Sequence, residues 1–328
     1  MLGHAVSVDT AMDDLLAQVT QSLAELVVPR HSHLPPAVAR VLRPGKLFRP
    51  RLTLGVSAAL GTTDPDAAVR AATAVELLHM SSLIHDDLMD DSPERRGVPS
   101  IHVAASPASA VAMGDLLLAR GAGVAAELGP ESARAFAHAL DQLWEGQLME
   151  SELASSTSVE PHLRYIGLKT AALMEAAAAM GALSQGATTE ETAHLARFGH
   201  AVGMAFQIAD DLLDHIGDPV VLGKAVAADL PRGVVSVGAW HALSLHGLTP
   251  HTTDAAVLDA LAAQDPSVTY AMTIIGEYLD LARSALHAAT TDIVVWDDAR
   301  AMIASMLERG VLQRHRPLIS QAMASWPV

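Results

Sequence analysis

The sequence predicts an all-α fold in a single large domain, on the strength of three observations. Apolar residues recur at helical spacing almost throughout the chain, and no segment shows the alternating pattern that is typical of a strand. Half of the 328 residues are hydrophobic but only 3% are aromatic, so the core must consist mainly of Ala, Leu, Val and Met, which suits close helix packing. No linker is long or biased enough to mark a boundary, so we expect residues 1–328 to form one domain.

Turn and cap signals divide the chain into about ten helices or more. Helix starts are predicted at Asp64-Pro65, at Ser158 to Pro161 and at Thr188 to Glu191. Ser, Thr and Asp cap the N-termini of helices, and Pro is tolerated in the first turn. The Gly-Pro pair at 129–130 and the turns at 217–219 and 247–250, each of which starts with Gly and ends with Pro, separate the later helices.

Composition narrows the class of protein. The 21 basic and 37 acidic residues give a net charge of −16, which argues against nucleic acid as a partner. The lack of Cys excludes disulfides and thiolate metal sites and fits a reducing compartment. Asp9, Asp13 and Asp14 lie where a signal peptide needs basic and then apolar residues, and the uncharged stretch 97–114 contains Pro, Ser and His. We therefore expect a soluble, cytoplasmic protein with no transmembrane segment.

Two acidic clusters repeat one spacing. Segments 86–90 (DDLMD) and 210–214 (DDLLD) both place Asp at i, i+1 and i+4 in apolar stretches without Pro. Residues four apart share one helix face, where like charges repel each other. A hard divalent cation removes that repulsion, and Mg²⁺ is commonly held by one or two carboxylates together with substrate phosphates. The two clusters together thus predict a site that binds a phosphorylated substrate through metal ions. For one cluster alone, a solvated acidic helix end is an equal alternative.

Basic residues follow the first cluster. Pro93 is expected to end or loosen the helix, so that Arg95 and Arg96 fold back over whatever the metal holds. Arginine suits this role because its planar fork matches two phosphate oxygens at once. The alternative is an acidic helix end followed by a basic loop.

From about Pro44 to Ser236 the chain resembles the trans-isoprenyl diphosphate synthases, also called polyprenyl synthetases, of the geranylgeranyl or longer-chain kind. Besides the acidic clusters, the resemblance rests on the segments 45–50 (GKLFRP), 76–79 (ELLH), 114–115 (GD), 146–147 (GQ), 169–170 (KT), 206–207 (FQ) and 222–224 (LGK). Their order and spacing together are highly specific. The resemblance implies a helical isoprenoid synthase bundle around a central cavity. It also implies Mg²⁺-dependent condensation of isopentenyl diphosphate with an allylic diphosphate, and a homodimer.

The resemblance implies that the two acidic helices face each other across the cavity. The expected Mg²⁺ ligands are Asp86, Asp90 and Asp210, with Asp87, Asp211 and Asp214 as secondary or water-mediated ligands. Further positive charge on the allylic diphosphate is expected from Arg95, Lys169 and Lys224. The side chains expected to point toward the reacting centre are Thr170, Gln207 and Gln147, although each of them also suits ordinary helix packing.

The second diphosphate, on isopentenyl diphosphate, needs a basic pocket of its own. The family positions that supply it match Gly45, Lys46, Arg49, His79 and Arg96. His79 lies two turns before Asp86 on the same helix face; the alternative role for it is that of a buried structural histidine. Lys46 and Arg49 alternatively form a basic pair on the surface.

Product length is expected to depend on the residues four and five positions before the first aspartate. These are Ser82 and Ser81, both small, so the resemblance implies growth beyond C15 to C20 or longer. Leu78 and Val75 lie one and two turns deeper on the same helix. Trp144 and Met149 are candidates to close the tunnel, and Trp144 equally suits core packing.

Three positions depart from the family pattern. Leu47, Val98 and Val234 stand where a basic residue is common, and a lost charge-assisted contact costs on the order of 1.5–3 kcal/mol. Arg232 is a possible replacement for the last of these.

Other functions remain open. One is a non-catalytic or modulating subunit of a heteromeric synthase, although this chain keeps all six aspartates. Another is a terpene cyclase on the same fold, which needs no isopentenyl diphosphate pocket. A di-iron bundle requires repeated Glu-x-x-His pairs, whereas segment 76–79 is a single one.

Overall fold

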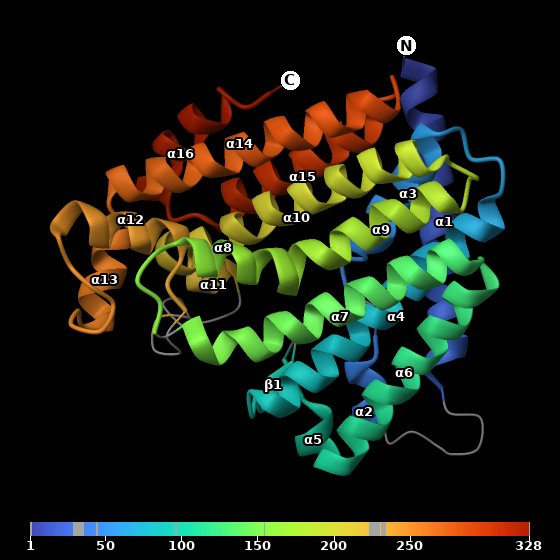
Figure 1. Ribbon diagram of the computed structural model, residues 1–328, viewed down its shortest axis with the longest axis horizontal. Coiled ribbons are helices and arrows are strands. Elements are labelled where there is room, and N and C mark those ends of the chain that lie inside the picture. Colours follow the sequence, from blue (N-terminus) through green and yellow to red (C-terminus); the bar gives the residue numbers. More distant parts are fainter. Residues whose placement is uncertain are drawn as a thin grey trace. The chain divides into compact units, whose positions relative to one another are not determined.

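A computed structural model describes residues 2–28, 36–43, 45–95, 97–153, 155–222, 230 and 234–327. The fold is all-α, as predicted. The helices in chain order are α1 (Leu2–Val27), α2 (Pro36–Val41), α3 (Phe48–Ala59), α4 (Pro65–Met89), α5 (Ile101–Ala104), α6 (Pro107–Glu127), α7 (Pro130–Leu153), α8 (Glu160–Ile166), α9 (Ala172–Leu183), α10 (Thr189–Ile216), α11 (Pro219–Leu222), α12 (Val237–His246), α13 (Ala255–Ala262), α14 (Asp265–Ala289), α15 (Val294–Gly310) and α16 (Arg316–Met323) (Figure 1). A π-helix, η1 (Gly167–Ala171), joins α8 to α9, and a 3₁₀ turn, η3 (Gln313–His315), precedes α16.

The chain divides into two compact units. Unit 1 comprises Met1–Leu140 and Ala176–Ala193, and unit 2 comprises Asp141–Glu175 and His194–Val328. The division falls within α7, α9 and α10. Each unit is described by itself below, and the expectation of a single domain over residues 1–328 stays a prediction.

The predicted helix starts at 64–65, 158–161 and 188–191 are confirmed. The Asp64 side chain accepts a hydrogen bond from Ala67 N at 2.8 Å, and Pro65 occupies the first position of α4. Thr188 and Glu191 form a capping box, because Thr188 N donates to Glu191 Oε2 at 2.8 Å and Glu191 N donates to Thr188 Oγ1 at 3.2 Å. Helix α8 begins at Glu160.

Unit 1 is built around α4, which packs side by side with α6 and also contacts α1 and α3 (Figure 1). Its core contains Leu77 of α4, Leu117 of α6 and Leu23 of α1, all fully buried. Gly121 lets α6 approach closely, since a Cβ there would lie 3.2 Å from the Ala74 carbonyl oxygen. Helix α4 therefore has little freedom to shift, and it carries the first acidic cluster at its C-terminal end.

In unit 2, the end of α10 is tied to two later helices by one buried histidine. His215 Nδ1 lies 2.7 Å from Asp259 Oδ1 on α13, and its Nε2 lies 2.7 Å from Oγ of Ser236, the N-cap of α12. Helix α12 also packs on α13 and α14. These contacts fix the C-terminal end of α10, which carries the second acidic cluster.

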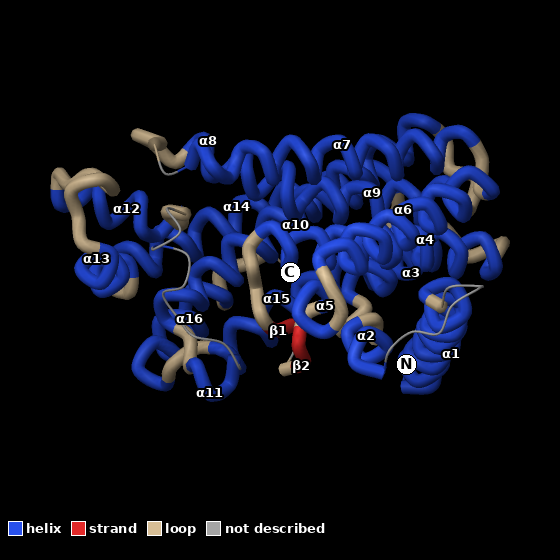
Figure 2. Tube along the Cα trace, turned by 90° about the horizontal axis from the view of Figure 1, so that it is seen from below, coloured by secondary structure: helices blue, strands red, loops and turns tan. Residues whose placement is uncertain are grey.

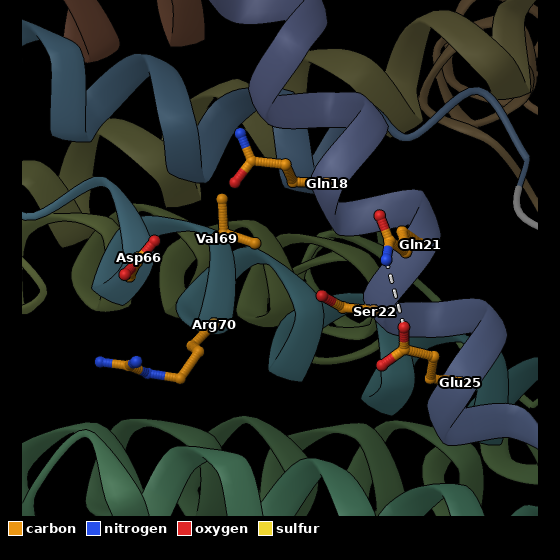
Figure 3. A pocket seen from close by; sticks show the side chains of 7 residues that line it. All are labelled: Gln18, Gln21, Ser22, Glu25, Asp66, Val69 and Arg70. Atoms are coloured by element: carbon orange, nitrogen blue, oxygen red, sulfur yellow. Dashed lines mark hydrogen bonds between the residues drawn. The ribbon is translucent and has the colours of Figure 1, made fainter.

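One short pair of strands interrupts the helices of this all-α fold. Glu94–Arg95 (β1) pairs antiparallel with Val98–Pro99 (β2), just after the first acidic cluster (Figure 2). Strands of two residues are too short to show an alternating pattern. Gly97, with φ of 73°, supplies the left-handed conformation that the turn requires.

Three stretches of the described chain are long and apolar enough to cross a membrane by length and composition alone: Pro65–Met89, Pro107–Glu127 and Glu160–Leu183. Protein atoms bury 78% of the apolar window in the first and 67% in the third, but only 33% in the second. The expectation of no transmembrane segment thus stays a prediction.

Candidate active site

The first acidic cluster lies where α4 ends. Asp86 is half-buried in the last turn, and Asp90, the C-cap residue, is exposed. The backbone N–H of Asp90 donates to the Asp86 carbonyl oxygen at 2.8 Å, so the two residues lie one turn apart, as their spacing predicts. Asp87, between them in the sequence, is buried.

Arg95 folds back onto this cluster and engages its middle aspartate, Asp87, whereas the expected partner was the metal-bound substrate. Arg95 Nε donates to Asp87 Oδ1 at 2.8 Å, and Nη2 donates to the same oxygen. The hairpin β1–β2 holds Arg95 in place for this contact. Asp87 is therefore neutralised by the protein itself, which fits the secondary role expected of it.

The motif Gly114-Asp115 on α6 has a physical explanation in its contact with His85. A Cβ on Gly114 would lie only 2.3 Å from His85 Nε2, so only glycine leaves room for the imidazole. Asp115 Oδ1 lies 3.4 Å from the same nitrogen. These residues fix the side chain next to Asp86.

Two residues expected in the isopentenyl diphosphate pocket meet in unit 1. Arg49 Nη1 of α3 lies 3.1 Å from His79 Nε2 of α4. Burial lowers the pKa of Arg49 to about 10, against the opposing field of the buried Glu76 carboxylate, so the guanidinium is still charged at neutral pH. Lys46 is exposed and Gly45 is half-buried just before α3, while Arg96 lies outside the described residues.

The residues expected to set product length lie within the α4–α6 contact. Ser81 is buried, and its Oγ donates to the Gly114 carbonyl oxygen at 2.8 Å. Ser82 Oγ donates to the His79 carbonyl oxygen at 2.9 Å. Leu78 and Val75 are buried below them. Trp144 and Met149 are half-buried on the part of α7 that belongs to unit 2, so their role at the tunnel end stays a prediction.

The second acidic cluster lies on α10 in unit 2. Asp210 is half-buried, whereas Asp211 and Asp214 are buried. Asp210 is thus the member of this cluster with the most accessible carboxylate. The expectation that the two clusters face each other stays a prediction.

The Lys169-Thr170 pair lies in η1, between two glycines. A Cβ on Gly146 of α7 would lie 3.1 Å from Lys169 N, and a Cβ on Gly203 of α10 would lie 2.6 Å from Ala171 Cα. Both helices therefore approach the backbone of the π-helix closely. Single π-turns inside helices are often found at functional sites.

Within unit 2, Lys169 pairs with a residue that the sequence did not suggest. Its Nζ donates to Glu150 Oε2 at 2.5 Å and lies 5.4 Å above the Tyr165 ring. Both charged side chains are largely buried. Glu150 follows Gln147 by one turn of α7, but nothing in the local sequence distinguishes it from a solvated glutamate.

Thr170 and Gln207 form the start of a hydrogen-bonded chain. Thr170 Oγ1 donates to Gln207 Oε1 at 2.8 Å, and Gln207 Nε2 donates to Asp211 Oδ1 at 2.8 Å. The other carboxylate oxygen of Asp211 lies 3.0 Å from His162 Nε2. Sequence reasoning missed His162, because its partner is 49 positions away along the chain.

The chain is similar in sequence to known proteins. A family model described as polyprenyl synthetase matches residues 32–275 of the chain. The chain is 36% identical over 257 residues to a nonaprenyl diphosphate synthase of Mycobacterium tuberculosis, covering 74% of this chain and 76% of that protein. It is 34% identical over 306 residues to heptaprenyl diphosphate synthase component 2 of Geobacillus stearothermophilus, covering 89% and 93%. The chain belongs to the polyprenyl synthetase family.

The solved structures agree with this assignment. A geranylgeranyl pyrophosphate synthase of Corynebacterium glutamicum, complexed with calcium and isoprenyl diphosphate, matches with a TM-score of 0.74 and 26% identity. The match covers 93% of this chain and 98% of that one. The enzyme class follows: this polyprenyl synthetase is a prenyl diphosphate synthase, a transferase of alkyl groups.

The donor groups of this polyprenyl synthetase fit a divalent metal that also binds substrate oxygens. Among the described residues, no three or more His, Asp or Glu side chains are grouped closely enough to hold a metal ion by themselves. Arg95 and His162 engage Asp87 and Asp211, while Asp90 is exposed and Asp86 and Asp210 are half-buried. Hard oxygen donors in such small number suit Mg²⁺, which keeps several positions for phosphate and water.

The departures from the family pattern have structural consequences. Leu47 has φ of 51° at the N-cap of α3, and its side chain packs against the unit 1 core. Val234 is buried, and Val98 lies half-buried in β2. All three positions therefore lack the basic residue that is common in the family. Lys224 and Arg232 lie outside the described residues.

Proposed function

We propose that this chain is a Mg²⁺-dependent synthase that condenses isopentenyl diphosphate with an allylic diphosphate, yielding a product of C20 or longer. The observation that carries the proposal is the separation of two kinds of site. Asp86, Asp90 and Asp210 carry half-buried or exposed carboxylates, whereas the charged Arg49 guanidinium meets His79 elsewhere, with Glu76 as a nearby buried carboxylate. A reaction of two diphosphate substrates needs both kinds.

The residues divide the work of binding. Arg49, charged at neutral pH, and His79 hold the diphosphate of isopentenyl diphosphate, with Lys46 and Arg96 contributing further charge. Asp86, Asp90 and Asp210 would hold Mg²⁺, which supplies charge neutralisation on the diphosphate that leaves the allylic substrate. Lys224 adds positive charge to the same leaving group, and Lys169 does so when the leaving group takes the place of its partner Glu150.

The remaining residues protect and direct the chemistry. The allylic carbocation requires a dry surrounding so that water does not intercept it, and the apolar faces of α4 and α6 provide buried Leu78 and Leu117. Thr170 and Gln207 present oxygen and amide groups from η1 and α10. Growth past C15 follows from the small side chains of Ser81 and Ser82.

A homodimer is part of the proposal. The apolar window of α6 is only one-third buried within this chain, and Ala108, Val111 and Ala112 are exposed along it. A second copy of the chain is the occupant that the family precedent suggests. Light scattering after size-exclusion chromatography tests this: the dimer is expected, and Val111→Glu should shift it toward monomer.

The name of the Geobacillus relative supports a second candidate function. That protein is component 2 of its synthase, so this chain is alternatively one of two subunits. The purified protein should be incubated with Mg²⁺, labelled isopentenyl diphosphate and allylic diphosphates of increasing length. Elongated diphosphates support the proposal, and turnover that requires a second polypeptide supports the subunit. Cyclic hydrocarbons from an allylic substrate alone would instead indicate a cyclase.

A further inference from the structure

His162 is a buried polar residue that the proposed reaction does not use directly. It lies on α8, and its Nε2 is 3.0 Å from Asp211 Oδ2, with both side chains almost fully buried. Carboxylate oxygens accept hydrogen bonds, so we assign Nε2 as the protonated nitrogen of His162, which donates to Asp211. The other ring nitrogen, Nδ1, has no hydrogen-bond partner among the described residues. The histidine is therefore committed to Asp211.

This contact ends a hydrogen-bonded chain with a fixed direction. Thr170 Oγ1 donates to Gln207 Oε1, and Gln207 Nε2 donates to Asp211 Oδ1. Because the amide donates on one side and accepts on the other, its orientation is determined by its two neighbours. The Thr170 hydroxyl donates its proton to Gln207, so the lone pairs of its oxygen can accept hydrogen bonds from other donors.

All four hydrogen-bonded residues belong to unit 2, so their contacts do not depend on unit 1. They come from three elements, α8, η1 and α10, which the tertiary structure brings together. These hydrogen bonds fix the side chain of Thr170, which follows Lys169 in the π-helix. A change at the far end of the hydrogen-bonded chain would thus be transmitted to the residues expected to contact the allylic substrate.

We propose that His162 is a positioning residue: by occupying Asp211 Oδ2 it holds the carboxylate, the Gln207 amide and the Thr170 hydroxyl in one arrangement. This inference rests on the proposed function for its catalytic consequence, but not for its geometry. Without His162, Asp211 Oδ2 would be left buried with no donor, and the carboxylate would turn toward a new partner. The Gln207 amide would then lose its fixed orientation. His162 acts on the chemical step and leaves the binding of isopentenyl diphosphate, which depends on unit 1 residues, unchanged.

The kinetic test compares three variants. His162→Phe keeps a flat ring but removes the donor, and it should lower kcat by roughly tenfold or more, with the KM for isopentenyl diphosphate unchanged. His162→Gln retains an N–H donor and should recover a large part of that loss. His200→Phe is a control in the same unit: His200 Nδ1 also lies 3.0 Å from a carboxylate, Glu175 Oε2, but this pair is more exposed to solvent. The control should keep the wild-type kcat.

A purely structural histidine gives another pattern. If folded His162→Phe keeps the wild-type kcat and loses only thermal stability, the positioning role is wrong. The positioning role is also wrong if the kcat of His162→Gln is no higher than that of His162→Phe.

A second readout does not depend on turnover. In protein labelled with ¹⁵N-histidine, the Nε2–H of His162 should give a slowly exchanging NMR signal that His162→Phe removes. Thr170→Val, at the other end of the chain, should shift this signal through Gln207 and Asp211. A missing signal, or no shift in Thr170→Val, overturns the inference. If the wild type shows no prenyl transfer, the proposed function fails, and this readout alone decides whether the coupled chain exists.

Discussion

Arg49 Nη1 donates a hydrogen bond to His79 Nε2 across 3.1 Å, and so joins α3 to α4. Because arginine has no acceptor, Nε2 of His79 must accept this bond, and the imidazole is neutral in this arrangement. The two residues belong to separate sequence motifs, 45–50 and 76–79, and only the fold brings them together. Their meeting supports a compact cationic site for one of the two diphosphates.

This pair predicts a substrate-specific defect. Arg49→Met removes a charge-assisted contact and should raise the KM for isopentenyl diphosphate roughly tenfold or more, with little change in the KM for the allylic diphosphate. Steady-state kinetics with each substrate varied in turn provides the measurement. Arg51→Met is a control on the same helix, since Arg51 forms an ion pair of 3.7 Å with the exposed Asp13. Equal rises in both KM values would contradict this assignment.

The contact between Gly114 and His85 predicts a large effect from a single methyl group. In Gly114→Ala the new Cβ would collide with the His85 imidazole. We therefore expect the free energy of unfolding to fall by roughly 1–3 kcal/mol and Mg²⁺ to bind more weakly at the neighbouring Asp86. Gly123→Ala on the same helix meets nothing within 4 Å and should instead stabilise the protein by about 0.5–1 kcal/mol. Denaturant titrations of both variants measure this contrast, and similar changes of the same sign would refute it.

Ser81 predicts control of product length. A phenylalanine at this position would fill space between α4 and α6, because Ser81 Oγ already reaches the Gly114 carbonyl oxygen. Ser81→Phe should shorten the product to C15 or less at a cost in thermal stability. Chromatography of the dephosphorylated products checks the outcome. The tunnel assignment fails if the folded variant makes the wild-type products, or if the wild type itself stops at C15.

Leu47 predicts a gain of affinity. It stands where a basic residue is common, and its φ of 51° places it at the N-cap of α3, just before Arg49. Leu47→Arg should lower the KM for isopentenyl diphosphate by roughly tenfold or more, because one charge-assisted contact is worth about 1.5–3 kcal/mol. Val98→Lys, on the hairpin, tests the second departure by the same assay. A KM for isopentenyl diphosphate that stays at the wild-type value in Leu47→Arg would show that this position does not face the substrate.

Local chemistry explains how far the sequence could predict the fold. The starts of α4 and α10 were predictable because Asp64, Thr188 and Glu191 satisfy nearby backbone N–H groups. The helical arrangement of the acidic clusters was also predictable from local sequence, because helix geometry alone places residues i and i+4 on one face. The hairpin β1–β2 escaped prediction because strands of two residues carry no periodicity.

Contacts between distant segments account for what the sequence did not predict. Glu150 and His162 look like ordinary helix residues until the fold places them against Lys169 and Asp211. The π-helix η1 depends on close approach by Gly146 and Gly203 from two other helices, which no local pattern encodes. The pairing of Arg95 with Asp87 was predicted only in outline, since the expected partner was the substrate.

The central claim is that carboxylates on α4 and α10 act through Mg²⁺ in prenyl transfer. The most direct test is the rate at which labelled isopentenyl diphosphate enters allylic products, measured across a Mg²⁺ titration for the wild type, Asp90→Asn and Asp210→Asn. We predict Mg²⁺-dependent synthesis by the wild type, none with chelator, and a loss of roughly 100-fold or more in each variant. Synthesis that proceeds unchanged in chelator, or full activity in both variants, would contradict the account.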